Sequence, residues 1–315
     1  MVNLVPCLDL DEYAEVWSKS EQSSPFNALW FISCVTKDPK ILLCKEGSET
    51  LAAIYFENNH GLLVSPKFSV YHSILISHPN SRSKTTNNII FNQRLISDIL
   101  SELKSQFGHF ELSLHPSLQD VRSFSWSNFQ DRGTKKIEIE PRYTAIKSLE
   151  INSNRELDYS SWSSGRKYDL LKSIKGGIQI LDFYDLGQFM QLYKETFHRQ
   201  NIEINPAIEV IIEKIFHSIP IDCRVAKIAV DKNGKYLSAG ITIIHKEIAY
   251  GLFSANRSKS RNTGSSTLLT YNLMTESYER GAREYDFVGA NSPNRGDFKL
   301  SFNSRLQTYF ETKYS

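Results

Sequence analysis

A lysine near the end of the chain stands in a setting that could do chemistry. Lys299 lies in the sequence Phe298-Lys299-x-x-Phe302. Upstream, the apolar segment Tyr285–Val288 precedes a stretch rich in Gly, Asn and Pro, which is typical of a strand that ends in a loop. We therefore expect a strand, a loop, a turn that carries the lysine, and a closing strand. That arrangement would place one lysine and several exposed backbone groups at the mouth of a sheet, where they could take part in chemistry.

A second group of polar residues fills the segment 257–267, which joins an expected strand to the start of an expected helix. Free backbone N–H groups and the helix dipole at such a start attract phosphate, and basic side chains and a glycine strengthen that interpretation. The candidate phosphate or pyrophosphate ligands are Arg261, Gly264, Ser265, Ser266 and Thr267. The alternative is an exposed polar loop with a serine cap at the helix start.

The elements that must position these residues follow the same order in both halves of the chain. Apolar segments and turn residues predict strands at 41–44, 51–56, 62–64 and 73–77, a polar loop at 78–88, a helix at 89–103 and a strand at 110–114. The second half predicts strands at 225–230, 237–244 and 248–253, a loop at 254–264, a helix at 265–280 and a strand at 285–288. Three further helices are expected at 166–174, 186–197 and 207–216. The two halves could also share this order of strands and helices by chance, because such orders recur often in proteins.

We interpret this order as an α+β protein built from two copies of one unit. Each unit is expected to be a mixed, mainly antiparallel sheet flanked by helices. The join is placed at Glu140-Pro141-Arg142, so the units span residues 1–141 and 142–315, with the candidate site in the second.

Composition narrows the classes of function. A chain of 315 residues with 40% hydrophobic residues can build packed cores, and its net charge of +2 does not by itself predict nucleic-acid binding. The four cysteines, Cys7, Cys34, Cys44 and Cys223, have no Cys-x-x-Cys spacing, so neither a metal site nor a disulfide scaffold is expected. No apolar run approaches the roughly 20 residues that span a bilayer. We expect no signal peptide, no stable membrane insertion and a cytoplasmic protein.

Two motifs resemble those of a known superfamily. Arg261-x-x-Gly264-x-Ser266 resembles the Gln/Arg-x-x-Gly-x-Gly/Ala pyrophosphate loop of GNAT-type N-acyltransferases, although Ser266 stands where Gly or Ala is usual. The closing segment with Phe298-Lys299-x-x-Phe302 resembles the end of the Fem-type branch, which includes peptidoglycan-bridge aminoacyltransferases and N-acyltransferases built from tandem GNAT units. The resemblance extends to the segments 142–146, 164–167 and 197–200, whereas the first half matches by layout alone.

The resemblance implies a mechanism in which an amine attacks an activated acyl carbonyl and forms an amide. Lys299 is then the candidate stabiliser of the tetrahedral oxyanion, with Phe298 beside it. Asp286 could accept a proton or orient the amine, and Tyr285 could donate to the oxyanion or the leaving group. Candidate substrate contacts are Asn291, Arg166, His198 and Arg199.

Each of these residues also has a purely structural interpretation. Lys299 could be a surface lysine, Asp286 a strand-end carboxylate that binds backbone amides, and Tyr285 a core aromatic residue. Asn291 suits a turn, Arg166 could face solvent alone, and His198 with Arg199 could complement a helix dipole.

Three functions follow from these observations. The favoured one is an N-acyltransferase that uses acyl-CoA as co-substrate and acts on an amine, either of a small molecule or of a peptidoglycan precursor in bacterial-type cell-envelope metabolism. Transfer from aminoacyl-tRNA is possible but not favoured, because a tRNA needs a broad positive face. A binding or scaffold protein that kept the fold without activity is the rival from another class.

Overall fold

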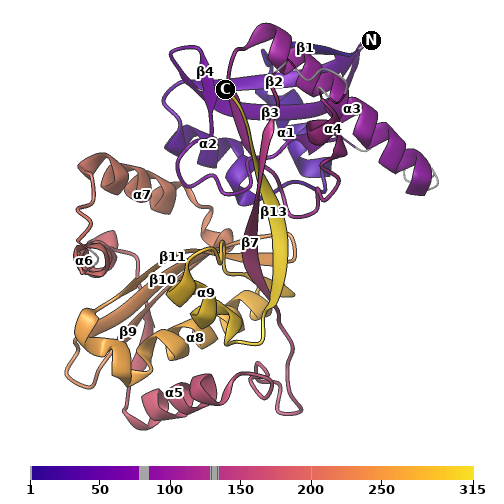
Figure 1. Cartoon of the computed structure of the whole chain (residues 1–315). Coiled ribbons are helices and arrows are strands. Elements are labelled where there is room, and N and C mark those ends of the chain that lie inside the picture. The colour runs from indigo at the N-terminus through magenta and orange to yellow at the C-terminus, as the bar shows by residue number, and fades with distance from the viewer. Residues whose placement is uncertain (1, 78–84, 128, 130–132, 134, 200) are drawn as a thin grey trace. The chain divides into compact units, whose positions relative to one another are not determined.

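The computed structural model describes residues 2–77, 85–127, 129, 133, 135–199 and 201–315, and of residues 85, 86 and 261 it describes the backbone alone. The chain divides into two compact units. The first comprises residues 1–142 and 308–315, and the second comprises residues 143–307. Figure 1 labels the elements of both.

The first unit is a sheet with helices on both faces. Its strands lie in the order β1 (Asn3–Pro6), β2 (Pro39–Glu46), β3 (Glu49–Asn59), β4 (Leu62–Val64), β6 (Phe110–Ser113) and β13 (Arg305–Tyr314, from residue 308 onward), with β5 (Leu75–Ile76) paired to β3. Its helices are α1 (Leu10–Lys19), η1 (Pro25–Asn27), α2 (Leu29–Val35), α3 (Thr85–Gln106) and α4 (Arg122–Trp126). Neighbouring strands are antiparallel except β4 and β6, which are parallel.

Alternation along the strands explains why helices cover both faces of this sheet. Leu42 and Cys44 of β2 pack in one cluster with apolar residues of α3. Leu43, between them, packs in another cluster with Tyr13 of α1 and Ile32 of α2. Successive side chains of a strand point to opposite faces, so one apolar run supplies both cores.

The second unit repeats this plan. Its sheet runs in the order β7 (Glu138–Ser148, from residue 143 onward), β12 (Glu284–Asp286), β11 (Ile248–Asn256), β10 (Tyr236–His245), β9 (Arg224–Val230) and β8 (Gln179–Asp182). The pair β11 and β12 is parallel, whereas the other pairs that the structure describes here are antiparallel. The other elements are α5 (Ser164–Lys175), α6 (Leu186–His198), α7 (Pro206–Ser218), η2 (Ile221–Cys223), η3 (Ser258–Thr263), α8 (Ser265–Glu279) and α9 (Pro293–Leu300).

Two layers of helices enclose this second sheet. α8 packs on β9 and β10 with α5 on its outer side, while α6 packs on the other face against β10 and β11 (Figure 1). Gly240 of β10 marks the close contact with α8, because a Cβ atom there would lie 2.8 Å from Leu273 Cδ1. On the opposite face Phe189 of α6 packs against Phe253 of β11.

The predicted fold class is confirmed, since the mixed, mainly antiparallel sheet is flanked by helices. Two local expectations differ from the structure. The expected turn around Lys299 is a helix, α9, with Pro293 in its first turn. Of the expected loop at 78–88, residues 78–84 lie outside the described residues, and the rest already belongs to α3.

Candidate functional site

Two neighbouring strands of the second unit, β11 and β12, separate at the centre of the candidate site. β11 and β12 pair in parallel over three residues each, and the last pair is Tyr250 with Asp286. Directly beyond it, the register of β11 against β10 shifts, because Gly251 faces Thr242 while Phe253 faces Ile241. Leu252 is therefore the extra residue of a β-bulge, which bends its strand. β11 continues beside β10 to Asn256, whereas β12 ends at Asp286.

Asp286 lies where the two strands separate, and its side chain binds the loop that follows β12. The residue is 2% exposed, and its Oδ1 accepts hydrogen bonds from the hydroxyl of Thr144 at 2.5 Å and from the backbone N–H of Val288 at 2.7 Å. The Thr144 hydroxyl oxygen in turn accepts from the N–H of Gly289 at 3.0 Å. The carboxylate and the hydroxyl thus fix the first residues after β12.

Lys299 binds the backbone carbonyl oxygens of the same loop. Its ammonium group donates to the carbonyl oxygens of Phe287 at 2.7 Å and Val288 at 3.2 Å, and also to that of Gly289. Val288 and Gly289 both have positive φ, 53° and 84°, an uncommon conformation for a β-branched residue. An ammonium group has three hydrogens to donate, so these carbonyls match its capacity.

The pKa of Lys299 is lowered to about 8, chiefly by burial of its ammonium group. The Asp286 carboxylate raises this pKa, and the positive charge of Arg295 lowers it. Lys299 is therefore a partly buried cation whose ammonium group binds the backbone of a loop with positive φ angles.

The hydroxyl of Tyr285 lies inside the core. It is 3.0 Å from the hydroxyl of Thr242, and burial raises the pKa of Tyr285 to about 12. A Cβ atom at Gly251 would lie 2.7 Å from that hydroxyl, so the glycine makes room for the tyrosine under the bulge. These contacts match the core interpretation of Tyr285.

Asn291 ties the loop to β7. Its Oδ1 accepts from the backbone N–H of Tyr143 at 2.8 Å, and the next residue back, Ala290, donates its N–H to the carbonyl of Tyr143 at 2.7 Å. The structure thus brings Asp286, Asn291 and Lys299 together around residues 287–290.

The start of α8 is covered by α5. Gly264 has a φ of 79°, and a Cβ atom there would lie 2.1 Å from the carbonyl oxygen of Asp169. The side chain of Ser265 is buried, and its hydroxyl has no hydrogen-bond partner among the described residues. The Ser266 hydroxyl donates to Asn256 Oδ1 at 2.5 Å. In this first turn, then, the glycine permits close packing of a second helix.

Arg166 of α5 completes this contact. Its guanidinium donates to Thr267 Oγ1 at 2.8 Å and pairs with Asp169 at 2.9 Å. It also lies over the ring of Phe298 in α9, with 4.9 Å between the guanidinium carbon and the ring centroid. Arg166 therefore links three helices. Of Arg261 the structure describes only the backbone, in η3, and its side chain lies outside the described residues.

His198 and Arg199 line a separate hollow of about 590 Å³. It lies at the end of α6, and its other lining residues are Gln191, Lys194, Glu195 and Ser258. His198 is exposed, and Arg199 is the C-terminal cap of α6. These two residues are not among those that gather around the 287–290 loop.

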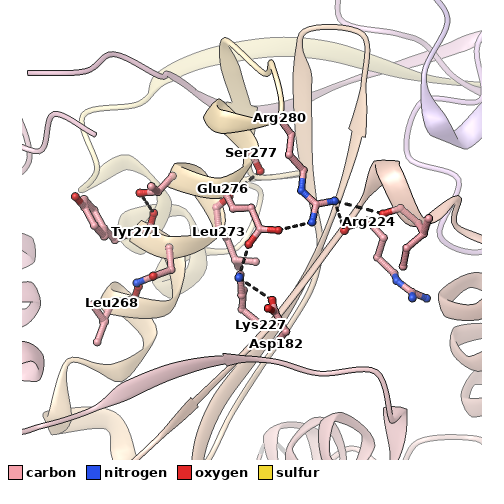
Figure 2. Close-up of polar contacts among 12 residues, drawn as sticks. Asp182, Arg224, Lys227, Leu268, Tyr271, Leu273, Glu276, Ser277 and Arg280 are labelled. Atoms are coloured by element: carbon pink, nitrogen blue, oxygen red, sulfur yellow. Dashed lines mark hydrogen bonds and ion pairs between the residues drawn. The ribbon is translucent and has the colours of Figure 1, made fainter. Parts of the chain in front are cut away.

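An ion-pair network that sequence reasoning missed anchors α8 to the sheet (Figure 2). Lys227 of β9 pairs with Asp182 of β8 at 2.7 Å and with Glu276 of α8. Burial alone lowers the pKa of Lys227, but these two carboxylates outweigh it, and the pKa stands above its ordinary value. Arg280 binds Glu276 and the backbone carbonyl of Arg224, which extends the network to the strand end.

Thr144 and the bulge at Leu252 were also missed. A threonine within the apolar stretch 143–149 was the available signal for Thr144, and the isolated Gly251 inside an apolar strand pattern was the available signal for the bulge. Among the described residues, no group of His, Cys, Asp and Glu could hold a metal ion. No helix in the described part of the chain is long and apolar enough to cross a membrane.

Comparisons with known proteins bear on this site. A family model described as an acetyltransferase (GNAT) domain matches residues 166–300. No curated protein sequence matches the chain significantly.

Solved structures match over the whole length. The crystal structure of FemX has a TM-score of 0.66 at 11% identity, covering 99% of this chain and 97% of that one. The C-terminal domain of a putative lysylphosphatidylglycerol synthetase from Agrobacterium fabrum has a TM-score of 0.59 at 9% identity, with 97% and 92% covered. A tandem GNAT protein from the clavulanic acid biosynthesis pathway has a TM-score of 0.53 at 10% identity, with 100% and 99% covered.

Proposed function

Residues 166–300 belong to the GNAT acetyltransferase domain family, and the chain has the Fem-type tandem GNAT fold; on this premise we propose that it transfers an acyl group from an activated donor to an amine. The amine attacks the acyl carbonyl, the tetrahedral intermediate loses the donor's thiol or hydroxyl group, and an amide forms. The protein's task in such a reaction is to align the two reactants and to stabilise the oxyanion.

The separation of β11 and β12 is the observation that most strongly supports this proposal. Beyond the pair of Tyr250 and Asp286, β11 keeps β10 on one side but no longer has β12 on the other. Its backbone groups on that side can pair with an extended ligand, as the edge of a sheet pairs with an added strand. The pantetheine arm of acyl-CoA is such a chain, since it carries two amide groups. We therefore propose that the donor lies along β11, with its acyl group near Leu252.

The charge at the site supports an electrostatic role for Lys299, exerted through the loop. All three carbonyls that it binds belong to residues 287–289, next to the opening. We propose that Lys299 positions this loop and contributes positive potential there, and that Asp286 and Thr144 fix the same loop from its N–H side. Phe298 and Asn291 contribute by holding α9 and the loop in place.

The α8 start contributes to donor binding less directly than expected from sequence. Gly264 packs against the Asp169 carbonyl, and Thr267 binds Arg166. The side of Gly264 on which a Cβ atom would lie faces α5, so a pyrophosphate group would have to approach this turn from another side. Acyl-CoA is our proposed donor, because a tRNA needs extensive positive charge and a chain with a net charge of +2 favours a small anionic donor.

The acceptor is proposed as the primary amine of a small molecule or of a peptidoglycan precursor, the class that the Fem-type resemblance implies. The hollow beside His198 and Arg199 is a candidate place for an anionic part of that acceptor. Both residues can donate hydrogen bonds to phosphate or carboxylate when they are protonated.

Release of free CoA thiol tests the proposal. The purified chain is incubated with acetyl-CoA and a panel of amino sugars, amino acids, peptides and a peptidoglycan-precursor peptide. Hydrogen exchange of β11 with and without CoA reports binding. Thiol release that depends on an amine, together with protection of residues 251–256, is expected. The aminoacyl-tRNA alternative predicts amide formation only when charged tRNA replaces acetyl-CoA, and a scaffold protein predicts no transfer with either donor.

A further inference from the structure

The outer face of α5 combines apolar and basic side chains. Tyr168 is 64% exposed, Leu171 50% and Ile174 55%. These residues follow one another at intervals of three, which places them along one side of a helix. Lys172 and Lys175, both exposed, flank them on the same helix, whereas Lys167 is half-buried and donates to the carbonyl oxygen of Ser160. α5 packs against α8 (Figure 1). It also contacts η3, and its residues Leu170 and Ser173 are buried.

α5 itself contributes no unpaired acidic side chain to this outer face. Asp169 is the sole acidic residue of α5, and it pairs inward with Arg166. Lys172 lies over the ring of Tyr168, with 5.7 Å between its Nζ atom and the ring centroid. A lysine beside an exposed aromatic ring is a common arrangement at membrane interfaces, where the ring and the lysine stem contact acyl chains and the charge stays in the headgroup layer.

The turn between β9 and β10 adds further lysines near the start of β8, the strand that follows α5. β8 follows α5 after two glycines, and its residue Gln179 pairs with Val230 at the end of β9. The turn that comes next contains Lys232 and Lys235, both exposed. Its acidic residue, Asp231, accepts hydrogen bonds from the backbone N–H groups of Asn233 and Lys235 and is thereby used within the turn.

We propose that α5 and the turn 231–235 form a docking surface for anionic lipid membranes. The apolar residues would enter the boundary between headgroups and acyl chains, and the lysines would bind lipid phosphates. A nucleic acid would satisfy the lysines but leave the exposed Leu171 and Ile174 without apolar contact, so the composition of the face favours a lipid surface. The contact is peripheral and reversible, and it is independent of which acyl group the protein transfers.

Vesicle flotation of the full-length chain tests this inference. The probes are phosphatidylcholine vesicles with and without phosphatidylglycerol, at low and high salt. We expect binding to the anionic vesicles that weakens with salt. The double variant Leu171→Glu/Ile174→Glu and the double variant Lys172→Glu/Lys175→Glu should each reduce it by about tenfold or more. The control is Val210→Glu/Lys214→Glu on α7, where one exposed apolar and one exposed basic residue change in the same way.

The outcomes separate the possible occupants of this face. Equal binding of the α5 and α7 variants, or no binding to anionic vesicles, overturns the inference. A dimer in solution that the α5 variants dissociate would assign the face to a second copy of the chain. Binding of tRNA that depends on α5, without vesicle binding, would assign it to nucleic acid. Circular dichroism and melting of each variant establish that it is folded, and a variant that fails this check is replaced by Leu171→Ser/Ile174→Ser.

Discussion

A Cβ atom at Gly264 would lie 2.1 Å from the carbonyl oxygen of Asp169, so α5 packs closely against the start of α8 at this glycine. In sequence the same glycine fits a phosphate-binding loop, since both roles need a residue without a side chain. The structure supplies the packing partner, and that partner belongs to the helix that we propose as a membrane-docking element.

Substitution of Gly264 tests this packing contact. Gly264→Ala should destabilise the protein by about 3 kcal/mol, because it adds a clash with backbone to the strain of a left-handed conformation. Gly234 is the matched control, since its φ of 76° is similar but nothing lies within 4 Å of a Cβ atom there. Gly234→Ala should cost only about 1 kcal/mol. Urea denaturation followed by circular dichroism measures both, and equal losses would contradict the packing role.

The pH dependence of stability tests the burial of Lys299. Its pKa is about 8 in the folded protein, below the ordinary lysine value of 10.5. Between these pH values the unfolded chain binds more protons than the folded one, so this residue's contribution to stability rises with pH. The free energy of unfolding of the wild type relative to Lys299→Met should increase by about 2 kcal/mol from pH 8 to pH 10, with a slope below the limit of about 1.4 kcal/mol per pH unit.

The difference in the free energy of unfolding between the wild type and Lys299→Met cancels the contributions of the other titratable groups, because both proteins contain them. Urea denaturation at pH 7, 8, 9 and 10 provides the four differences. A difference that stays constant across this range would mean that the ammonium group is solvated in the folded protein, and that the carbonyls of residues 287–289 are held in another way.

Much of the fold could be predicted because its signals are local. The alternation of Leu42, Leu43 and Cys44, each facing a different core from its neighbour, is written in the apolar run of a strand. The Asn233-Gly234 pair marks the β9–β10 turn, and Gly281 follows the end of α8. Each of these depends on residues within a few positions of one another.

The site depends on contacts that no local pattern encodes. Thr144 meets Asp286, and Arg166 meets Thr267, across long stretches of sequence. The three carbonyls around Lys299 come from consecutive residues whose conformation is set by that contact itself. Sequence reasoning could mark Lys299 and Asp286 as chemically able residues, but the partners that occupy their polar atoms appear only in three dimensions.

The network around Lys227 should stabilise the second unit more than an exposed pair does. Lys227→Met should cost about 2 kcal/mol, because it leaves Asp182 and the largely buried Glu276 without their shared cation. The pair of Lys194 with Glu209 is the control, since half of the Lys194 side chain is exposed. Lys194→Met should change the free energy of unfolding by less than about 1 kcal/mol. Similar values for the two variants in urea denaturation would rule out a special role for the network.

The hydroxyl of Thr144 offers a test of the proposed acyl-transfer site that does not touch Lys299. It donates to Asp286 and accepts from Gly289, so Thr144→Val removes two hydrogen bonds at the loop that borders the β11–β12 opening. We expect a loss of about 2 kcal/mol in stability and, at a temperature where the variant is folded, a fall of about tenfold in the rate of CoA release.

Thr144→Ser keeps the hydroxyl and should restore most of the rate, which separates the hydrogen bonds from the shape of the side chain. If Thr144→Val transfers acyl groups as fast as the wild type while its stability falls as expected, the loop at residues 287–289 contributes to folding alone. The reaction would then have to be placed elsewhere along β11.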